Sequence, residues 1–134
     1  MKNKNWAFIL FTTFCLVCMS PFPVNASYDF EHVYRVKFAP GTSGAVIDGT
    51  AIRYSRNIYL LGARAGQVMN VKITAMQDNA VFTIQDPKKR FLKGAAQFDD
   101  VTTWRGRLPL SGDYRINVSA ARANAHYKML VMIN

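Results

Sequence analysis

Two hydroxyl-bearing residues at a sharp bend are the part of this sequence best suited to chemistry. Ser111 and Tyr114 are separated by a Gly-Asp pair, and Pro109 stiffens the chain just before them. Hydroxyl groups donate and accept hydrogen bonds without a charge to bury, so such a tip could enter a cleft of another protein. The same residues also suit a plain structural corner in which the tyrosine packs into the core. Both interpretations stay open on these residues alone.

Catalysis by this region is not expected. Ser111 could act as a nucleophile with His126, but Asp113 is too close to it in the sequence to orient that base, and no nucleophile-elbow pattern surrounds the serine. The other histidine, His32, has no spaced group of ligands around it, so we expect no metal site. The acidic pair at residues 99–100 lacks the further oxygen ligands of a calcium loop. The sequence therefore predicts a non-enzymatic protein without a cofactor or a metal.

The first 26 residues have the composition of a secretory signal. Lys2 and Lys4 precede an apolar run over residues 6–19, and a Val-Asn-Ala sequence ending at Ala26 resembles a cleavage site. We expect cleavage after Ala26 and a periplasmic or secreted domain from 27 to 134. The apolar run is short for a membrane span, so no stable membrane insertion is expected after cleavage. Lipid attachment at Cys18 is the alternative, although the residues before it are not the small ones that this modification favours.

Removal of residues 1–26 changes the chemistry of the remaining chain. Both cysteines, Cys15 and Cys18, lie in that segment, so no disulfide or reactive thiol is expected afterwards. Two lysines are also lost, which lowers the formal net charge from +9 to +7. A basic surface favours acidic partners. Nucleic acid is not expected, because the aromatic residues fall mostly on the apolar side of their strands and not on an exposed stacking platform.

From residue 33 onwards the sequence has the pattern of short strands. Apolar and polar residues alternate, most clearly over 68–75 and 114–121, and turn signals recur about every ten residues. We expect strands over residues 33–38, 44–54 (around a turn at Asp48-Gly49), 57–63, 68–75, 80–84, 104–108, 114–121 and 127–133. This predicts an all-β fold, a single antiparallel β-sandwich of about eight strands.

Four parts of the sequence together point to a known family. They are residues 59–67 (YLLGARAGQ), residues 79–82 (NAVF), residues 104–116 (WRGRLPLSGDYRI) and the region from Arg122 through the closing strand. In these parts the chain resembles the periplasmic inhibitors of animal lysozymes, most of all those of g-type and i-type lysozymes. The resemblance covers residues 34–133. It implies a small β-sandwich that Gram-negative bacteria export against host lysozyme.

The resemblance also implies a site. In that family a Ser-Gly-x-Tyr loop enters the lysozyme cleft, and its serine and tyrosine engage the catalytic carboxylates. The matching inhibitory loop is Ser111, Gly112, Asp113 and Tyr114, and the expected rim contacts are Arg107, Arg115 and Arg122. The expected partner is an animal lysozyme, with g-type slightly favoured over i-type, and no oligomeric state follows. The alternative is a non-catalytic binding module resembling pre-peptidase C-terminal domains, in which Tyr114 packs into the core.

Overall fold

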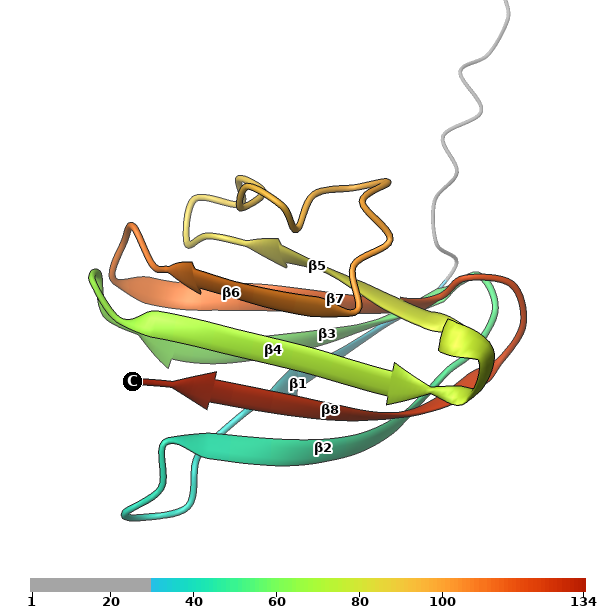
Figure 1. Ribbon diagram of the computed structural model, residues 1–134, viewed down its shortest axis with the longest axis horizontal. Coiled ribbons are helices and arrows are strands. Elements are labelled where there is room, and N and C mark those ends of the chain that lie inside the picture. The colour runs from blue at the N-terminus through green and yellow to red at the C-terminus, as the bar shows by residue number, and fades with distance from the viewer. Residues whose placement is uncertain (1–29) are drawn as a thin grey trace, which may run out of the picture.

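Residues 30–134 are described by a computed structural model and form two stacked β-sheets of four strands each (Figure 1). The strands are β1 (Phe30–Arg35), β2 (Gly44–Ala51), β3 (Ser55–Ala63), β4 (Val68–Ala75), β5 (Ala80–Gln85), β6 (Thr103–Arg107), β7 (Gly112–Ala120) and β8 (Ala125–Ile133). A short 3-10 helix, η1 (Met76–Asp78), joins β4 to β5. The predicted all-β sandwich is confirmed. The expected signal segment, its cleavage site at Ala26 and Cys18 lie outside the described residues.

The two sheets differ in that only one of them contains a parallel pair of strands. One sheet has the order β1-β3-β7-β5 and the other β2-β8-β4-β6. Neighbouring strands are antiparallel except β1 and β3, which run parallel with Phe30 opposite Ser55 and Arg35 opposite Leu60. A parallel pair needs a crossover instead of a hairpin, and here the chain crosses through β2 in the opposite sheet. In these strand orders β1 and β2 each lie at an edge of their sheet.

The core lies between the sheets and follows the alternation of the sequence. On β7, Tyr114, Ile116 and Val118 point inward and are fully buried, as the pattern predicts. Met129 and Val131 do the same from β8 in the facing sheet. Side chains from two sheets thus interdigitate, which is how a sandwich removes its apolar surface from water.

The long connection between β5 and β6 also belongs to the core, which the sequence analysis did not foresee. Its residues Leu92, Ala95 and Val101 are buried. Its backbone bonds to the outer edge of β5, where Phe82 N–H donates to Val101 O (2.9 Å) and Ile84 N–H donates to Ala95 O (3.0 Å). The segment lacks strand alternation, so its apolar residues gave no signal of a packed element.

One predicted turn is wrong. Asp48 and Gly49 lie inside β2, which continues without interruption and pairs with β8 so that Gly49 faces Tyr127. A Cβ atom at Gly49 would lie 2.5 Å from the Tyr127 ring and hydroxyl, closer than real contacts allow. The glycine is therefore needed to let an aromatic ring cross the strand, not to turn the chain.

The chain turns after Asp86, and the turn is built around that side chain. Asp86 is 3% exposed, and its carboxylate accepts hydrogen bonds from the backbone N–H groups of Lys88 and Arg90 and from Arg90 Nε. Burial opposes its ionisation, but these donors outweigh burial and hold the pKa of Asp86 below its ordinary value. The turn fixes Pro87, which packs against the bend described below.

The histidines and acidic residues do not assemble a metal site in the part of the chain that the structure describes. His126 Nδ1 shares a hydrogen bond with Thr50 Oγ1 across β8 and β2 (2.8 Å), and His32 is exposed on β1. No three His, Cys, Asp or Glu side chains within residues 30–134 come together as a metal ion would require. Over the same range no helix has the length and apolar character needed to cross a membrane.

Candidate functional site

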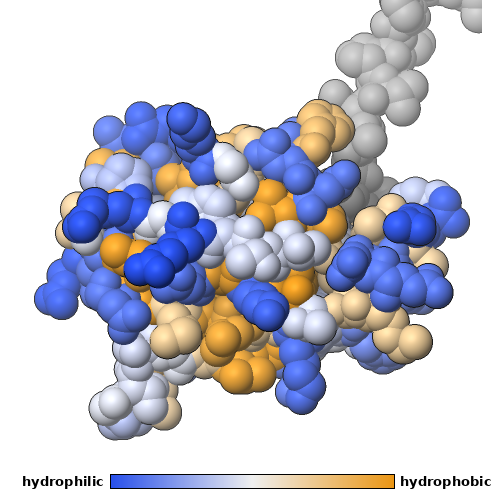
Figure 2. Space-filling model, viewed as in Figure 1, coloured by the Kyte–Doolittle hydropathy of each residue, from blue (hydrophilic) through white to orange (hydrophobic). Residues whose placement is uncertain are grey.

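The bend that carries Ser111 joins β6 to β7 at one end of the sandwich, on the left in Figure 1. Leu108, 1% exposed, anchors the start of the bend in the core. Its backbone is bonded to the turn between β3 and β4 in both directions: Gly66 N–H donates to Leu108 O, and Leu108 N–H donates to Gln67 O, both at 2.8 Å. Bend and turn therefore form one surface, and Figure 2 shows hydrophilic side chains gathered at this end of the molecule.

Ser111 lies exposed at the tip of the bend. Its Oγ accepts a hydrogen bond from the backbone N–H of Ala65 (2.9 Å), which positions the side chain. The hydroxyl hydrogen has no acceptor among the described residues and is available to an outside partner. Arg107 adds another tie to the same turn, with Nη1 donating to Gly66 O (2.7 Å).

Gly112 gives the bend its direction. Its φ of +139° is one that side-chain-bearing residues rarely adopt. A Cβ atom at this position would also lie 2.9 Å from Cγ of Pro87. Both the backbone and the packing therefore require glycine between the serine and the start of β7.

Asp113 points aside from the tip and is neutralised by a distant residue. Arg35, the last residue of β1, donates from Nη1 and Nη2 to the two carboxylate oxygens, each at 2.7 Å. This bidentate hydrogen bonding lowers the pKa of Asp113 and raises the pKa of Arg35. Both side chains are about half exposed (51% and 45%), so the pair contributes little to folding stability but cancels the only negative charge of the bend.

Tyr114 packs into the core and does not present its hydroxyl to solvent. Of the two arrangements that the sequence left open, this is the one that the structure has. The residue is 0% exposed because it begins the inward-facing series of β7. Its hydroxyl donates to Leu110 O (2.7 Å) and accepts from Leu110 N–H (3.1 Å). Burial is the main reason that the pKa of Tyr114 is raised. The tyrosine therefore holds the bend from beneath, as in a tyrosine corner.

The three arginines predicted at the rim separate in the structure. Arg107 flanks the bend, and Arg115 lies on the outer face of β7 between Leu60 and Gln85. Arg122 follows the far end of β7, a strand of nine residues. At about 3.3 Å per residue, that strand places Arg122 roughly 30 Å from the bend. A rim contact by Arg122 is therefore corrected: its backbone N–H instead donates to Asn79 Oδ1 (2.8 Å) at the opposite end.

Arg35 is the site residue that the sequence analysis missed. It stands 78 positions before Asp113, and no motif links the two. Only the parallel pairing of β1 with β3 brings it to the bend, because Leu60 lies opposite both Arg35 on β1 and Arg115 on β7. The neighbouring turn, by contrast, had a signal in its Ala-Gly-Gln sequence at residues 65–67.

Comparison with known proteins places this chain beside lysozyme inhibitors. No family model matches the sequence, and no curated protein sequence matches it either. Among solved structures, the chain is similar to PliG of Aeromonas hydrophila, a periplasmic lysozyme inhibitor of g-type lysozyme. The two share 32% identity and a TM-score of 0.68 over 78% of this chain and 97% of that one.

Two further structures share the fold. Salmonella Typhimurium PliG, described in the same terms, is 22% identical with a TM-score of 0.61 over 77% of this chain and 98% of that one. The pre-peptidase C-terminal domain of a Bacillus anthracis collagenase is 10% identical with a TM-score of 0.51 over 75% of this chain and 93% of that one. At such low identity these two likenesses show the fold alone.

Proposed function

Because this chain belongs to the PliG family of periplasmic lysozyme inhibitors, we propose that it inhibits a g-type lysozyme of animals. The observation that carries the proposal is the similarity to the Aeromonas protein over nearly that protein's whole length, together with the exposed, firmly held serine at the bend. The PliG relatives are inhibitors and not enzymes, which supports a non-catalytic role. Their periplasmic location agrees with a periplasmic or secreted location for this chain.

In the proposed mechanism the bend at residues 108–113 enters the lysozyme cleft with Ser111 leading. Lysozyme works with a pair of carboxyl groups, one of them an acid with a raised pKa. The hydroxyl hydrogen of Ser111 can be donated to such a carboxylate without carrying a charge into the cleft. Asp113 would be repelled there, and the bidentate contact with Arg35 supports the proposal by neutralising it.

The stiffness of the bend supports tight binding. Three hydrogen bonds between backbone or serine and the turn at residues 64–67 hold it, and Tyr114 holds it from the core side. A loop that is already ordered loses little conformational entropy when it inserts into a partner. Tyr114 therefore acts as a positioning residue, and direct contact with lysozyme is assigned to Ser111.

The test is an assay of peptidoglycan lysis by g-type, i-type and c-type lysozymes with increasing amounts of the purified protein. We expect g-type lysozyme to be blocked near equimolar ratio. Ser111→Ala should weaken the block about tenfold or more, the value of one hydrogen bond to a charged group. The matched control is Ser43→Ala, which removes an exposed serine hydroxyl in the connection between β1 and β2.

Two outcomes would contradict the proposal. If none of the three lysozymes is affected, the chain is a sandwich-shaped binding module with another partner, as its fold-level likeness to the collagenase domain allows. If Ser111→Ala and Ser43→Ala inhibit equally well, the inhibitory surface lies elsewhere on the molecule.

A further inference from the structure

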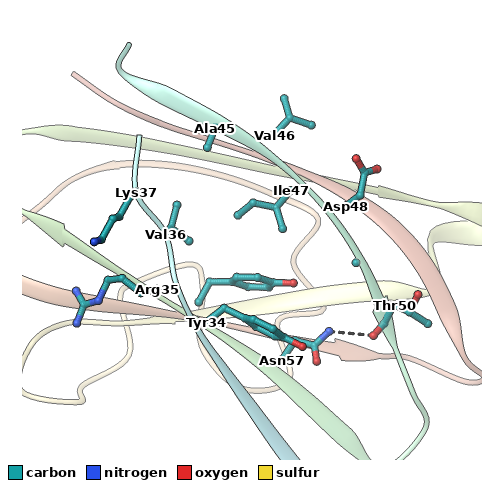
Figure 3. Close-up of a pocket in the computed structure, with 12 residues that line it drawn as sticks. Tyr34, Arg35, Val36, Lys37, Ala45, Val46, Ile47, Asp48, Thr50 and Asn57 are labelled. Carbon is teal, nitrogen blue, oxygen red and sulfur yellow. Dashed lines mark hydrogen bonds between the residues drawn. The ribbon is translucent and has the colours of Figure 1, made fainter. Parts of the chain in front are cut away.

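The edge of the sandwich between β1 and β2 is open. The two edge strands diverge there and leave a cleft of about 540 Å³, which Figure 3 shows with its lining side chains. Cavities of this size are typical of sites that bind small molecules. The cleft is lined from β1, β2 and β3, whereas the bend joins β6 to β7. The two surfaces meet at Arg35, which lines the cleft and pairs with Asp113 of the bend.

Aromatic and aliphatic side chains form one part of the lining. The rings of Tyr34 and Tyr59 stack with their centres 5.3 Å apart and an interplanar angle of 22°. Tyr34 remains 47% exposed although it is a large aromatic residue. Val36 and Ile47 line the cleft from its two strands and are half-buried. These groups can cover the apolar face of a ligand.

The cleft also contains a polar group whose bonding capacity is not used. Asn57 lines it and is 4% exposed. Its Nδ2 donates to Thr50 O (2.9 Å) and to the Tyr127 hydroxyl (2.8 Å). Its Oδ1 accepts no hydrogen bond from any residue in the range that the structure describes. This oxygen is not one of the buried side-chain atoms that lack a partner, so it is open to the cleft and can accept a hydrogen bond from a ligand.

Charge is distributed unevenly across the cleft. Figure 3 shows Arg35 and Lys37 extending from the β1 side away from the tyrosine rings, and Asp48 on the outer side of β2, so the charged groups stand at the rim of the cleft and not inside it. Arg35 is occupied by Asp113, and Asp48 is 3.5 Å from Lys128. Lys37 is exposed and forms no ion pair with another described residue. The rim of the cleft therefore carries an available cation on the β1 side and carboxylate and hydroxyl oxygens on the β2 side, which a ligand that projects from the cleft could reach.

We propose that the cleft between β1 and β2 binds a saccharide whose pyranose ring carries a carboxylate. The stacked tyrosines and aliphatic residues would cover the apolar C–H face of the ring. Asn57 Oδ1 and the oxygens of Asp48 and Thr50 would accept hydrogen bonds from its hydroxyl groups, and Lys37 would pair with the carboxylate. A fatty acid fits less well, because Asn57 places an amide within the cleft and charged groups stand on both sides of its rim.

This inference goes beyond the proposed function and does not depend on it. Two natural classes of sugar have a pyranose ring with a carboxylate: the acidic amino sugars of cell walls and the uronic acids of polysaccharides. The probes are therefore N-acetylmuramic acid and glucuronic acid, each beside its uncharged counterpart, N-acetylglucosamine and glucose. Titration followed by nuclear magnetic resonance of backbone amides would locate the binding, and calorimetry would measure affinity.

We expect at least one acidic sugar at millimolar concentration to shift signals of residues 34–37 and 45–50, with its uncharged counterpart binding more weakly. Lys37→Gln should weaken binding of that acid about fivefold or more, the effect of losing one exposed charge contact. Lys72→Gln, the same change on β4 in the other sheet, should leave binding unchanged. Tyr34→Leu keeps apolar bulk at an exposed position but removes the aromatic ring. It should therefore weaken the binding of acidic and neutral sugars alike.

The proposal is overturned if no cleft signal moves with either acid, or if Lys37→Gln binds the acid as well as Lys72→Gln does. Its failure is distinguishable from failure of the lysozyme proposal. Ser111→Ala should bind the sugar normally, and Lys37→Gln should inhibit lysozyme normally.

Discussion

The bend at residues 108–113 and the cleft between β1 and β2 are constructed in opposite ways. At the bend, the backbone of Leu108, the Ser111 hydroxyl oxygen and the one carboxylate are bonded inside the molecule. At the cleft, an amide oxygen of Asn57 and the ammonium group of Lys37 have none among the described residues, and an aromatic ring stays half exposed.

The difference shows how one small sandwich can serve two kinds of recognition. A projecting segment that inserts into a partner needs its shape fixed in advance, so its internal bonds are satisfied. A concave site that receives a ligand needs groups left over for that ligand. Substitutions at Gly112 and Tyr114 should therefore affect stability and inhibition together, whereas substitutions at the exposed cleft residues Tyr34 and Lys37 should leave both almost unchanged.

The largest expected effect is at Gly112. Gly112→Ala should lower the free energy of unfolding by about 2 to 3 kcal/mol, because the new side chain is strained at this φ and meets Pro87. Inhibition should fall as well, since relief of the contact moves the tip. Chemical denaturation and the lysis assay measure the two effects.

Gly41→Ala is the matched control for that change. Gly41 also has a positive φ, +76°, but nothing lies within 4 Å of a Cβ built on it. Its substitution should cost about 1 kcal/mol, the backbone effect alone. Equal losses for the two glycines would show that packing on Pro87 does not hold the bend.

A smaller effect is expected from the hydroxyl of Tyr114. Tyr114→Phe leaves the carbonyl and N–H of Leu110 without their partner and should lower the free energy of unfolding by about 1 to 2 kcal/mol. Tyr34→Phe, the same change in the cleft, should have almost no effect on stability, because Tyr34 is half exposed. If the two variants unfold alike, the bend is not held from the core side.

The smallest effect on stability is expected at Arg35, although inhibition should respond. Arg35→Gln uncovers the charge of Asp113 and should weaken inhibition about threefold to tenfold, with the unfolding midpoint nearly unchanged. The double variant Arg35→Gln with Asp113→Asn removes the uncovered charge and should restore inhibition. A double variant that inhibits no better than Arg35→Gln would exclude charge masking as the role of Arg35.

Local pattern was enough to predict much of this molecule. The alternation on β7 places Tyr114, Ile116 and Val118 on one face, and their burial follows from it. That alternation already favoured a packed tyrosine, and it outweighed the exposed position that the Ser-Gly-x-Tyr motif implied. The exposed serine and the glycine beside it were likewise predictable from turn chemistry.

Contacts between distant segments were not predictable in this way. The pairing of Arg35 with Asp113 depends on a parallel strand pair that no local signal announces. Gly49 carries the sequence signature of a turn, yet the reason for the glycine is the ring of Tyr127 on another strand. Arg122 is close to the bend in sequence, but an extended strand separates them in space.

The connection between β5 and β6 protects the molecule from self-association. Because Val101 and Ala95 accept hydrogen bonds from β5, that edge has few free N–H groups with which to recruit a strand from a second copy. The connection is thus a built-in guard against aggregation through this edge. Attempts to trim this scaffold to a minimal version should leave residues 91–101 in place.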